Sequence, residues 1–311
     1  MNNNIAIRTI VPIILLMVLG FFSRKFGILK SGDERVLNAY VYYFALPALF
    51  LVDLAEIHFT MENLTFALAG IIPVILIIVI YTISYIVFRF PKDTLYLLVP
   101  STTFGSYAFF GIPFIIFAFP TDEALRLATL ASATISLVSV TISITTLEFF
   151  RLEKTTKFQG IKRVAKRLSK NPLITSIFLG VLLSLSNIEI PTPISTSLHM
   201  LGSTTATVAV FLLGVFLYGR RYTKFARAIE LSLFRVAFLP TIAFVVTLLF
   251  NLSSLKSTIL VLMHAMPVAI SMIVLSERYN FHKETIASLI LISSISAGFY
   301  LNLWLLLLGY N

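Results

Sequence analysis

Long apolar stretches, repeated along almost the whole chain, are the feature that most constrains its fold. A bilayer core about 30 Å thick requires about 20 apolar residues per helix. On this basis we predict about ten spanning segments, at 5–23, 36–54, 64–88, 94–118, 124–148, 172–188, 195–218, 230–250, 256–277 and 284–308. Backbone polar groups in lipid must be satisfied within a segment, so each is predicted to be a helix.

Composition excludes a water-soluble protein. Of the 311 residues, 58% are hydrophobic and 12% are charged, whereas soluble domains have about 45–50% apolar and about 25% charged residues. The first span follows an uncharged leader and lacks a small-residue cleavage site, so we expect it to be retained rather than removed as a signal peptide. With no cysteine in the chain, disulfides, thiol chemistry and cysteine metal sites are excluded.

The net charge of +10 has a spatial pattern. If the N-terminus is outside, the odd-numbered connections are cytoplasmic and carry most of the Lys and Arg residues, while several acidic residues lie outside. This is the positive-inside pattern, and it predicts that both termini are outside. Nucleic-acid binding is disfavoured because the basic loops contain no interleaved aromatic residues.

The chain is predicted to consist of two inverted halves. A basic linker at 151–171 separates 1–150 from 172–311, and each half would contain five helices. With an odd number of helices per half, the second half must enter the membrane from the opposite side. The segment from Pro12 to Gly20 aligns with the segment from Pro172 to Gly180, with Pro, Ile, Leu and Gly retained.

Two prolines lie at matching positions, in the fourth helix of each half. Pro113 and Pro267 are both mid-span. Proline removes an N–H group and clashes with the carbonyl one turn earlier, and freed polar groups at membrane depth must face protein or a water-filled cavity. A matched pair of broken helices indicates a transport site; the alternative is a pair of structural kinks.

Several short stretches, taken in order, resemble the auxin efflux carrier family. The likeness covers nearly the whole chain and is carried by its order more than by any single motif. The stretches are Tyr42 to Phe50, Phe104 to Pro113, Lys170 to Pro172, Leu212 to Gly214, and Met266 with Pro267.

The resemblance implies an all-α membrane protein with ten transmembrane helices in two inverted five-helix repeats, whose fourth and ninth helices break and cross near their prolines. It also implies a scaffold of helices 1, 2, 6 and 7, against which a transport domain of helices 3–5 and 8–10 moves like an elevator. Family members move organic acids, including auxin and small carboxylates, so we expect a small organic anion as substrate and the plasma membrane as location. The short linker resembles that of microbial members. Where the family usually has asparagine followed closely by glycine, this chain has Ser106 and Ala108.

Candidate substrate-binding residues cluster around the two expected breaks. An anion at a broken helix can be held by backbone N–H groups at the positive helix N-terminus. Each hydroxyl has the alternative of bonding its own helix, and His264, an ionisable group deep in a span, has the alternative of a neutral imidazole bridging two helices. The predicted set is Thr103, Ser106, Tyr107, Pro113, His264, Pro267, Ser271 and Asn302.

The positions of the acidic residues bear on ion coupling. Asp53, Glu148 and Glu277 lie at helix ends, and we expect Glu148 and Glu277 to pair with Arg151 and Arg278. No carboxylate occupies the middle of a predicted span, so sodium symport is unsupported, and we predict electrogenic, cation-independent export.

Other functional classes remain as alternatives. These are a proton-coupled organic-acid symporter, a channel or receptor, and a membrane-embedded enzyme, for which we find no catalytic motif. No cofactor or metal is expected, and monomer and homodimer both remain open.

Overall fold

The computed structural model describes residues 5–56, 60–151, 169–219 and 222–310. Within these ranges the secondary structure is helical, apart from one isolated β-bridge. Among the described residues, six helices are long and apolar enough to cross a membrane: Glu34–Ala55, Met61–Phe88, Asp122–Phe150, Thr192–Leu217, Phe225–Leu249 and Lys283–Leu307. The prediction of an all-helical membrane protein agrees with this architecture.

Every stretch predicted from the sequence falls on helix, and two of them are interrupted. The stretch at 94–118 divides into two parts around residues 104–106, and the stretch at 256–277 divides around residues 266–271. The elements are α1 (Ile5–Lys25), α2 (Glu34–Tyr40), η1 (Val41–Ala45), α3 (Leu46–Ala55), α4 (Met61–Phe88), α5 (Lys92–Thr103), η2 (Tyr107–Gly111), α6 (Ile112–Ala118), α7 (Asp122–Arg151), α9 (Pro172–Leu185), α10 (Thr192–Leu217), α11 (Phe225–Leu233), η4 (Phe234–Phe238), α12 (Leu239–Leu249), α13 (Ser254–Ala265), α14 (Met272–Tyr279) and α15 (Lys283–Leu307).

One group of helices packs closely through glycines. Helix α1 lies against α10, where a Cβ added to Gly20 would be 2.0 Å from the carbonyl oxygen of Phe211, and one added to Gly214 would be 1.9 Å from that of Met17. Gly180 of α9 lies in the same way against the backbone of α3. In lipid, small residues allow this close approach, which packing forces then stabilise.

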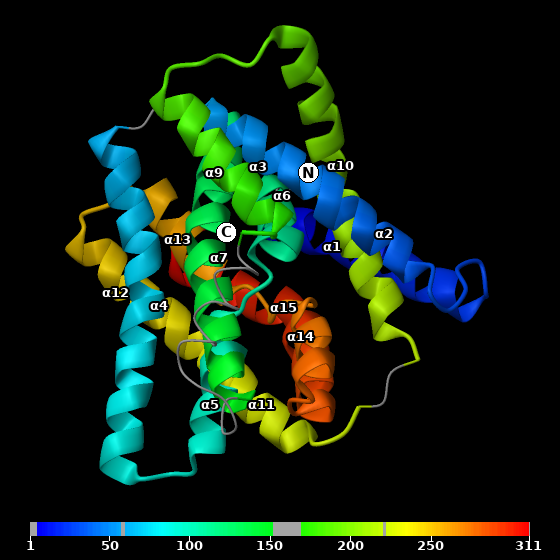
Figure 1. Ribbon diagram of the computed structural model, residues 1–311, viewed down its shortest axis with the longest axis vertical. Coiled ribbons are helices and arrows are strands. Elements are labelled where there is room, and N and C mark those ends of the chain that lie inside the picture. The colour runs from blue at the N-terminus through cyan, green and yellow to red at the C-terminus, as the bar shows by residue number, and fades with distance from the viewer. Residues whose placement is uncertain (1–4, 57–59, 152–168, 220–221, 311) are drawn as a thin grey trace.

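The remaining helices form a second group. Helices α4 and α7 run side by side, and α12 packs on both α4 and α13 (Figure 1). Helix α5 packs on α7, and α15 packs on α11, α13 and α14. The two groups meet where α3 touches α7 and where α1 and α10 touch α6. Both interrupted stretches therefore lie in the second group, next to the first.

Three short π-helical segments, η1, η2 and η4, each end two residues before a proline, at Pro47, Pro113 and Pro240. A proline cannot donate to the carbonyl one turn earlier and its ring clashes with that carbonyl. A local widening to π geometry accommodates the ring and is common at functional sites. Pro113 is therefore the second residue of α6, and the break of this stretch lies at 104–106, ahead of the position that the proline suggested.

Candidate functional site

The two unwound segments cross and are hydrogen bonded to each other. The N–H of Ser106 donates to the carbonyl of Pro267 at 2.8 Å, and the N–H of Ala269 donates to the carbonyl of Phe104 at 3.0 Å. These bonds flank the isolated antiparallel β-bridge. Two segments that are far apart in sequence thus satisfy each other's backbone groups, as membrane depth requires.

Four helix ends converge at this crossing. Helices α5 and α13 end there with their carbonyl groups, and η2 and α14 begin there with their N–H groups. The first-turn N–H groups of a helix have no intrahelical partner, and at η2 these belong to Tyr107, Ala108 and Phe109. The crossing therefore presents both positive and negative ends of helix dipoles.

A buried arginine, Arg235 of η4, contacts the crossing directly. Its Nε donates to the carbonyl of Met266 at 2.7 Å, and its Nη1 donates to the carbonyl of Thr102 at 2.5 Å and to the hydroxyl of Tyr107 at 3.0 Å. The side chain is fully buried, and Nη2 has no hydrogen-bond partner in the described part of the chain. A charged donor group is thus held inside the protein at the point where the helices break.

Gly105 and Tyr107 shape the space for this guanidinium. A Cβ on Gly105 would lie 1.6 Å from Nη2 of Arg235 and 2.9 Å from Cε1 of Tyr107, so glycine is the residue that fits between these two side chains. The ring of Tyr107 lies 5.0 Å from the guanidinium carbon, within the range of a cation–π contact. The hydroxyl of Tyr107 also donates to the carbonyl of Thr103 at 2.7 Å.

The charge of Arg235 has no acidic partner among the described residues. The ion pairs of that part of the chain involve other residues. A buried cation is costly unless nearby groups compensate it. Here two main-chain carbonyls, a hydroxyl and an aromatic face provide the compensation.

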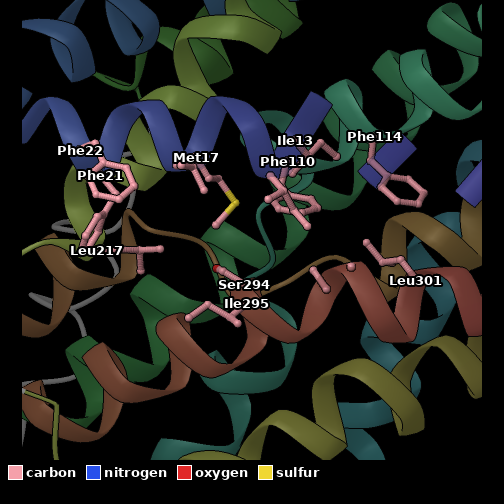
Figure 2. A pocket seen from close by; sticks show the side chains of 14 residues that line it. Ile13, Met17, Phe21, Phe22, Phe110, Phe114, Leu217, Ser294, Ile295 and Leu301 are labelled. Atoms are coloured by element: carbon pink, nitrogen blue, oxygen red, sulfur yellow. The ribbon is translucent and has the colours of Figure 1, made fainter. Parts of the chain in front are cut away.

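An apolar cavity of about 340 Å³ adjoins the crossing. Helix α1 forms one wall and α15 the other, with Phe110 and Phe114 at one end and Phe21 and Phe22 at the other (Figure 2). Ser294 is the polar side chain among its lining residues. The cavity and the crossing share the element η2, which begins directly after the break and contributes Phe110 to the cavity lining. The residue before Ser294, Ser293, accepts a hydrogen bond from the N–H of Val268 at 3.2 Å.

The structure places four predicted residues at the crossing itself. Ser106 and Pro267 form one of the two pairing bonds, and the hydroxyl of Ser106 makes no hydrogen bond within the described residues. Tyr107 contacts Arg235. Thr103 is the last residue of α5, and its hydroxyl donates to the carbonyl of Val99 in the same helix at 2.8 Å. This is the alternative to substrate binding that is expected for a hydroxyl in a membrane helix.

The other predicted residues lie in different surroundings. Pro113 is buried in α6 beyond the break, and the Nε2 of His264 bonds the carbonyl of Gly70 in α4 at 2.9 Å, so the imidazole bridges two helices. Ser271 is exposed just before α14. Asn302 donates to Gly298 of its own helix, and its side-chain oxygen has no partner in the described part of the chain.

Arg235 lies within the predicted span 230–250, but it is not among the site residues predicted from the sequence. The available signal was the rule that an ionisable group within the membrane is a functional candidate, which we applied to His264. Ser293 is also absent from the predicted set, and its bond to the unwound segment could be found only from the structure.

The predicted partners of two acidic residues lie outside the described side chains. These are Arg151 for Glu148 and Arg278 for Glu277, and the side chain of Glu277 is itself not described. Glu148 accepts a hydrogen bond of 2.6 Å from the hydroxyl of Tyr279. This contact joins α7 to α14 away from the crossing.

A membrane bundle with discontinuous helices that meet at a buried charge belongs to the class of membrane transport proteins. The sequence then identifies the family. Residues 5–305 match the model of the membrane transport protein family, so the chain belongs to that family and the resemblance to the auxin efflux carriers is confirmed. Membership implies a transporter rather than an enzyme.

Two relatives resemble the chain over almost its entire length. The uncharacterized transporter MJ1031 of Methanocaldococcus jannaschii is 26% identical over 309 residues, covering 96% of this chain and 98% of the relative. The uncharacterized transporter YfdV of Escherichia coli is 21% identical over 321 residues, covering 96% of each chain. The chain is therefore a multi-pass membrane transporter, and its relatives leave the substrate open.

Proposed function

We propose that this protein is a secondary carrier of small organic anions, such as carboxylates or auxin-like acids, in the plasma membrane. The observation that carries the proposal is the crossing of two unwound segments over a buried arginine, beside an apolar cavity. Broken helices at membrane depth mark transport sites because their free ends can bind charged groups.

The anionic group binds at the start of η2. The first-turn N–H groups there are unpaired by the helix, and the positive end of the helix dipole favours an anion. The hydroxyl of Ser106 adds a donor at the same break. The apolar body of the substrate extends into the cavity between α1 and α15, whose lining offers little but hydrocarbon and aromatic rings.

The chain has ten spans in two inverted repeats, 1–150 and 172–311, with the short basic linker 151–171 between them and both termini outside. Support comes from matching glycines: Gly20 of α1 and Gly180 of α9 occupy equivalent positions of the aligned segments, and each lies against the backbone of a helix from the other half. Most of the linker lies outside the described residues. The charge pattern of the connections supports the orientation.

Transport uses an elevator movement between two domains. The scaffold consists of α1, α2 with α3, α9 and α10, which pack on one another. The transport domain consists of the remaining helices and carries both unwound segments. The cavity lies between α1 of the scaffold and α15 of the transport domain, where a sliding movement would carry bound substrate past the scaffold.

Export is the favoured direction for an anion that moves without a cation. An inside-negative potential contributes about 2.3 kcal/mol per charge per 100 mV toward the outside. Proton symport is the second candidate, and His264, whose buried Nδ1 has no hydrogen-bond partner in the described part of the chain, is the histidine to test for it. The two functions differ in their response to a pH gradient at fixed voltage.

Flux into proteoliposomes tests the proposal. A panel of carboxylates is offered at an imposed voltage, with and without sodium or pH gradients, and we expect saturable, voltage-driven flux that does not require sodium. Variants Pro267→Ala and Ser106→Ala should lower this flux, whereas Ser197→Ala should not. Ser197 is exposed on α10 and bonds its own helix at 2.9 Å.

Three outcomes would contradict the proposal of a cation-independent anion carrier. Single-channel conductance would identify a channel, and a strict requirement for a sodium gradient would contradict cation-independent transport. Unchanged flux in both Pro267→Ala and Ser106→Ala, with correctly folded protein, would remove the crossing as the site.

A further inference from the structure

Arg235 lies where two helices end with their negative poles. Its bonds go to Thr102 in the last turn of α5 and to Met266, the residue that caps α13. A helix C-terminus carries about half of a negative elementary charge. Two such ends together carry about one unit, which a single guanidinium balances.

In transporters with discontinuous helices, the free N-termini face the anionic substrate, while C-terminal ends and unwound carbonyls coordinate the coupling sodium ion or proton. We propose that the guanidinium of Arg235 is a tethered replacement for that coupling cation. It neutralises the two negative helix ends permanently, so the positive ends of η2 and α14 stay free to bind the anion. The inference rests on the proposed function, since it concerns coupling at the same crossing.

The contacts favour this role over direct binding of substrate. Nε donates to the carbonyl of Met266, and Nη1 donates to the carbonyl of Thr102 and to the hydroxyl of Tyr107. The aromatic ring of Tyr107 also makes a cation–π contact with the guanidinium. The remaining nitrogen, Nη2, is buried against Gly105 rather than facing the cavity, whose lining does not include Arg235. The group is thus enclosed as a bound ion would be, on a side chain that cannot leave.

The position also explains why the crossing needs no acidic residue. A mobile cation site in a membrane commonly uses carboxylate oxygens, and a fixed guanidinium supplies positive charge instead. The described residues contain no group of three or more His, Cys, Asp or Glu arranged to hold a metal ion. Because the cation stays with the protein, each monovalent anion should carry one net charge across the membrane.

Removal of the side chain should convert a cation-independent carrier into a cation-dependent one. Wild-type flux should be equal in choline, sodium and guanidinium salts. Arg235→Ala should lose its flux in choline and regain it with added guanidinium, which fits the vacated space. Radiolabelled guanidinium should then move together with the anion in Arg235→Ala and not in the wild type.

Two further variants separate this role from a general structural one. Arg235→Lys keeps a tethered positive charge and should retain flux in choline. The double variant Gly105→Ala/Arg235→Ala places a methyl group where Nη2 stood, at a backbone position without positive φ, and needs only a small shift of the Tyr107 ring, whose Cε1 would lie 2.9 Å away. It should lose the rescue by guanidinium. If Arg235→Ala does not yield monodisperse protein, Arg235→Ser, which leaves a similar space, replaces it in every assay.

A thermal-unfolding assay without substrate makes the inference testable apart from the proposed function. Guanidinium at millimolar concentration should raise the unfolding midpoint of Arg235→Ala by about 2–4 °C, and choline should not. If the wild type moves no organic anion, the proposed function fails while this shift still reports the cation site. The inference is overturned if guanidinium neither stabilises folded Arg235→Ala nor restores its flux, or if the wild type itself requires a cation.

Discussion

The hydroxyl of Ser106 is placed for a direct role in binding. Its backbone is fixed on both sides, since the N–H pairs with Pro267 and the carbonyl accepts from Phe110 and Gly111, each at 3.0 Å. The side chain, in contrast, has no hydrogen-bond partner within the described residues. Serine here offers one hydroxyl, whereas the asparagine usual in the family would offer a carbonyl and an amide group.

We therefore expect Ser106→Ala to weaken substrate binding while leaving the fold unchanged. Loss of one hydrogen bond of about 0.5–1.5 kcal/mol corresponds to a rise in KM of about two- to tenfold. Initial rates of flux over a range of carboxylate concentrations provide the measurement. The matched control is Ser197→Ala, and an equal effect of both changes would show that the hydroxyl at 106 has no special role.

At the scale of elements, α1 and α10 are held together by backbone contact at Gly214. A Cβ at this position would lie 1.9 Å from the carbonyl oxygen of Met17, a distance that requires the helices to separate. In the same helix, a Cβ on Gly202 would lie 3.1 Å from Leu49, which a small shift accommodates.

Gly214→Ala should therefore lower the unfolding midpoint much more than Gly202→Ala. Overpacking costs about 1–3 kcal/mol, whereas the milder contact at 202 should cost far less. Thermal unfolding of both variants in the same detergent compares them directly. Equal midpoints would mean that α1 can move away from α10 without loss of stability, which would contradict the proposal that these helices form a rigid scaffold.

Hydropathy was sufficient to place the helices, because each span must satisfy its own backbone in lipid. The position of the first break was not predictable in this way. Pro113 only widens the helix ahead of it, and the chain unwinds at 104–106, where it pairs with a segment that is distant in sequence. The role of Arg235 depends on the same pairing, because its acceptors are carbonyls exposed by the two breaks.

At the scale of the whole molecule, the proposed elevator movement needs contacts that break between the two groups of helices. The hydroxyl of Thr129 in α7 donates to the carboxylate of Asp53 in α3 at 2.8 Å and joins the groups. By comparison, the hydroxyl of Ser257 in α13 donates to that of Thr247 in α12 at 2.7 Å within the second group. The first bond must open during an elevator cycle, whereas the second stays closed.

Cysteine pairs at these positions test the movement, and the natural chain contains no cysteine that would interfere. Asp53→Cys/Thr129→Cys, bridged by mercuric ion, should lose flux and recover it when excess thiol removes the ion. Thr247→Cys/Ser257→Cys, bridged in the same way, should keep its flux, because both residues move together. Flux that survives bridging of α3 to α7 would mean that substrate crosses without relative movement of the two groups. The crossing and its arginine would then lie in a fixed pathway, and the cavity beside α1 would be a permanent part of it.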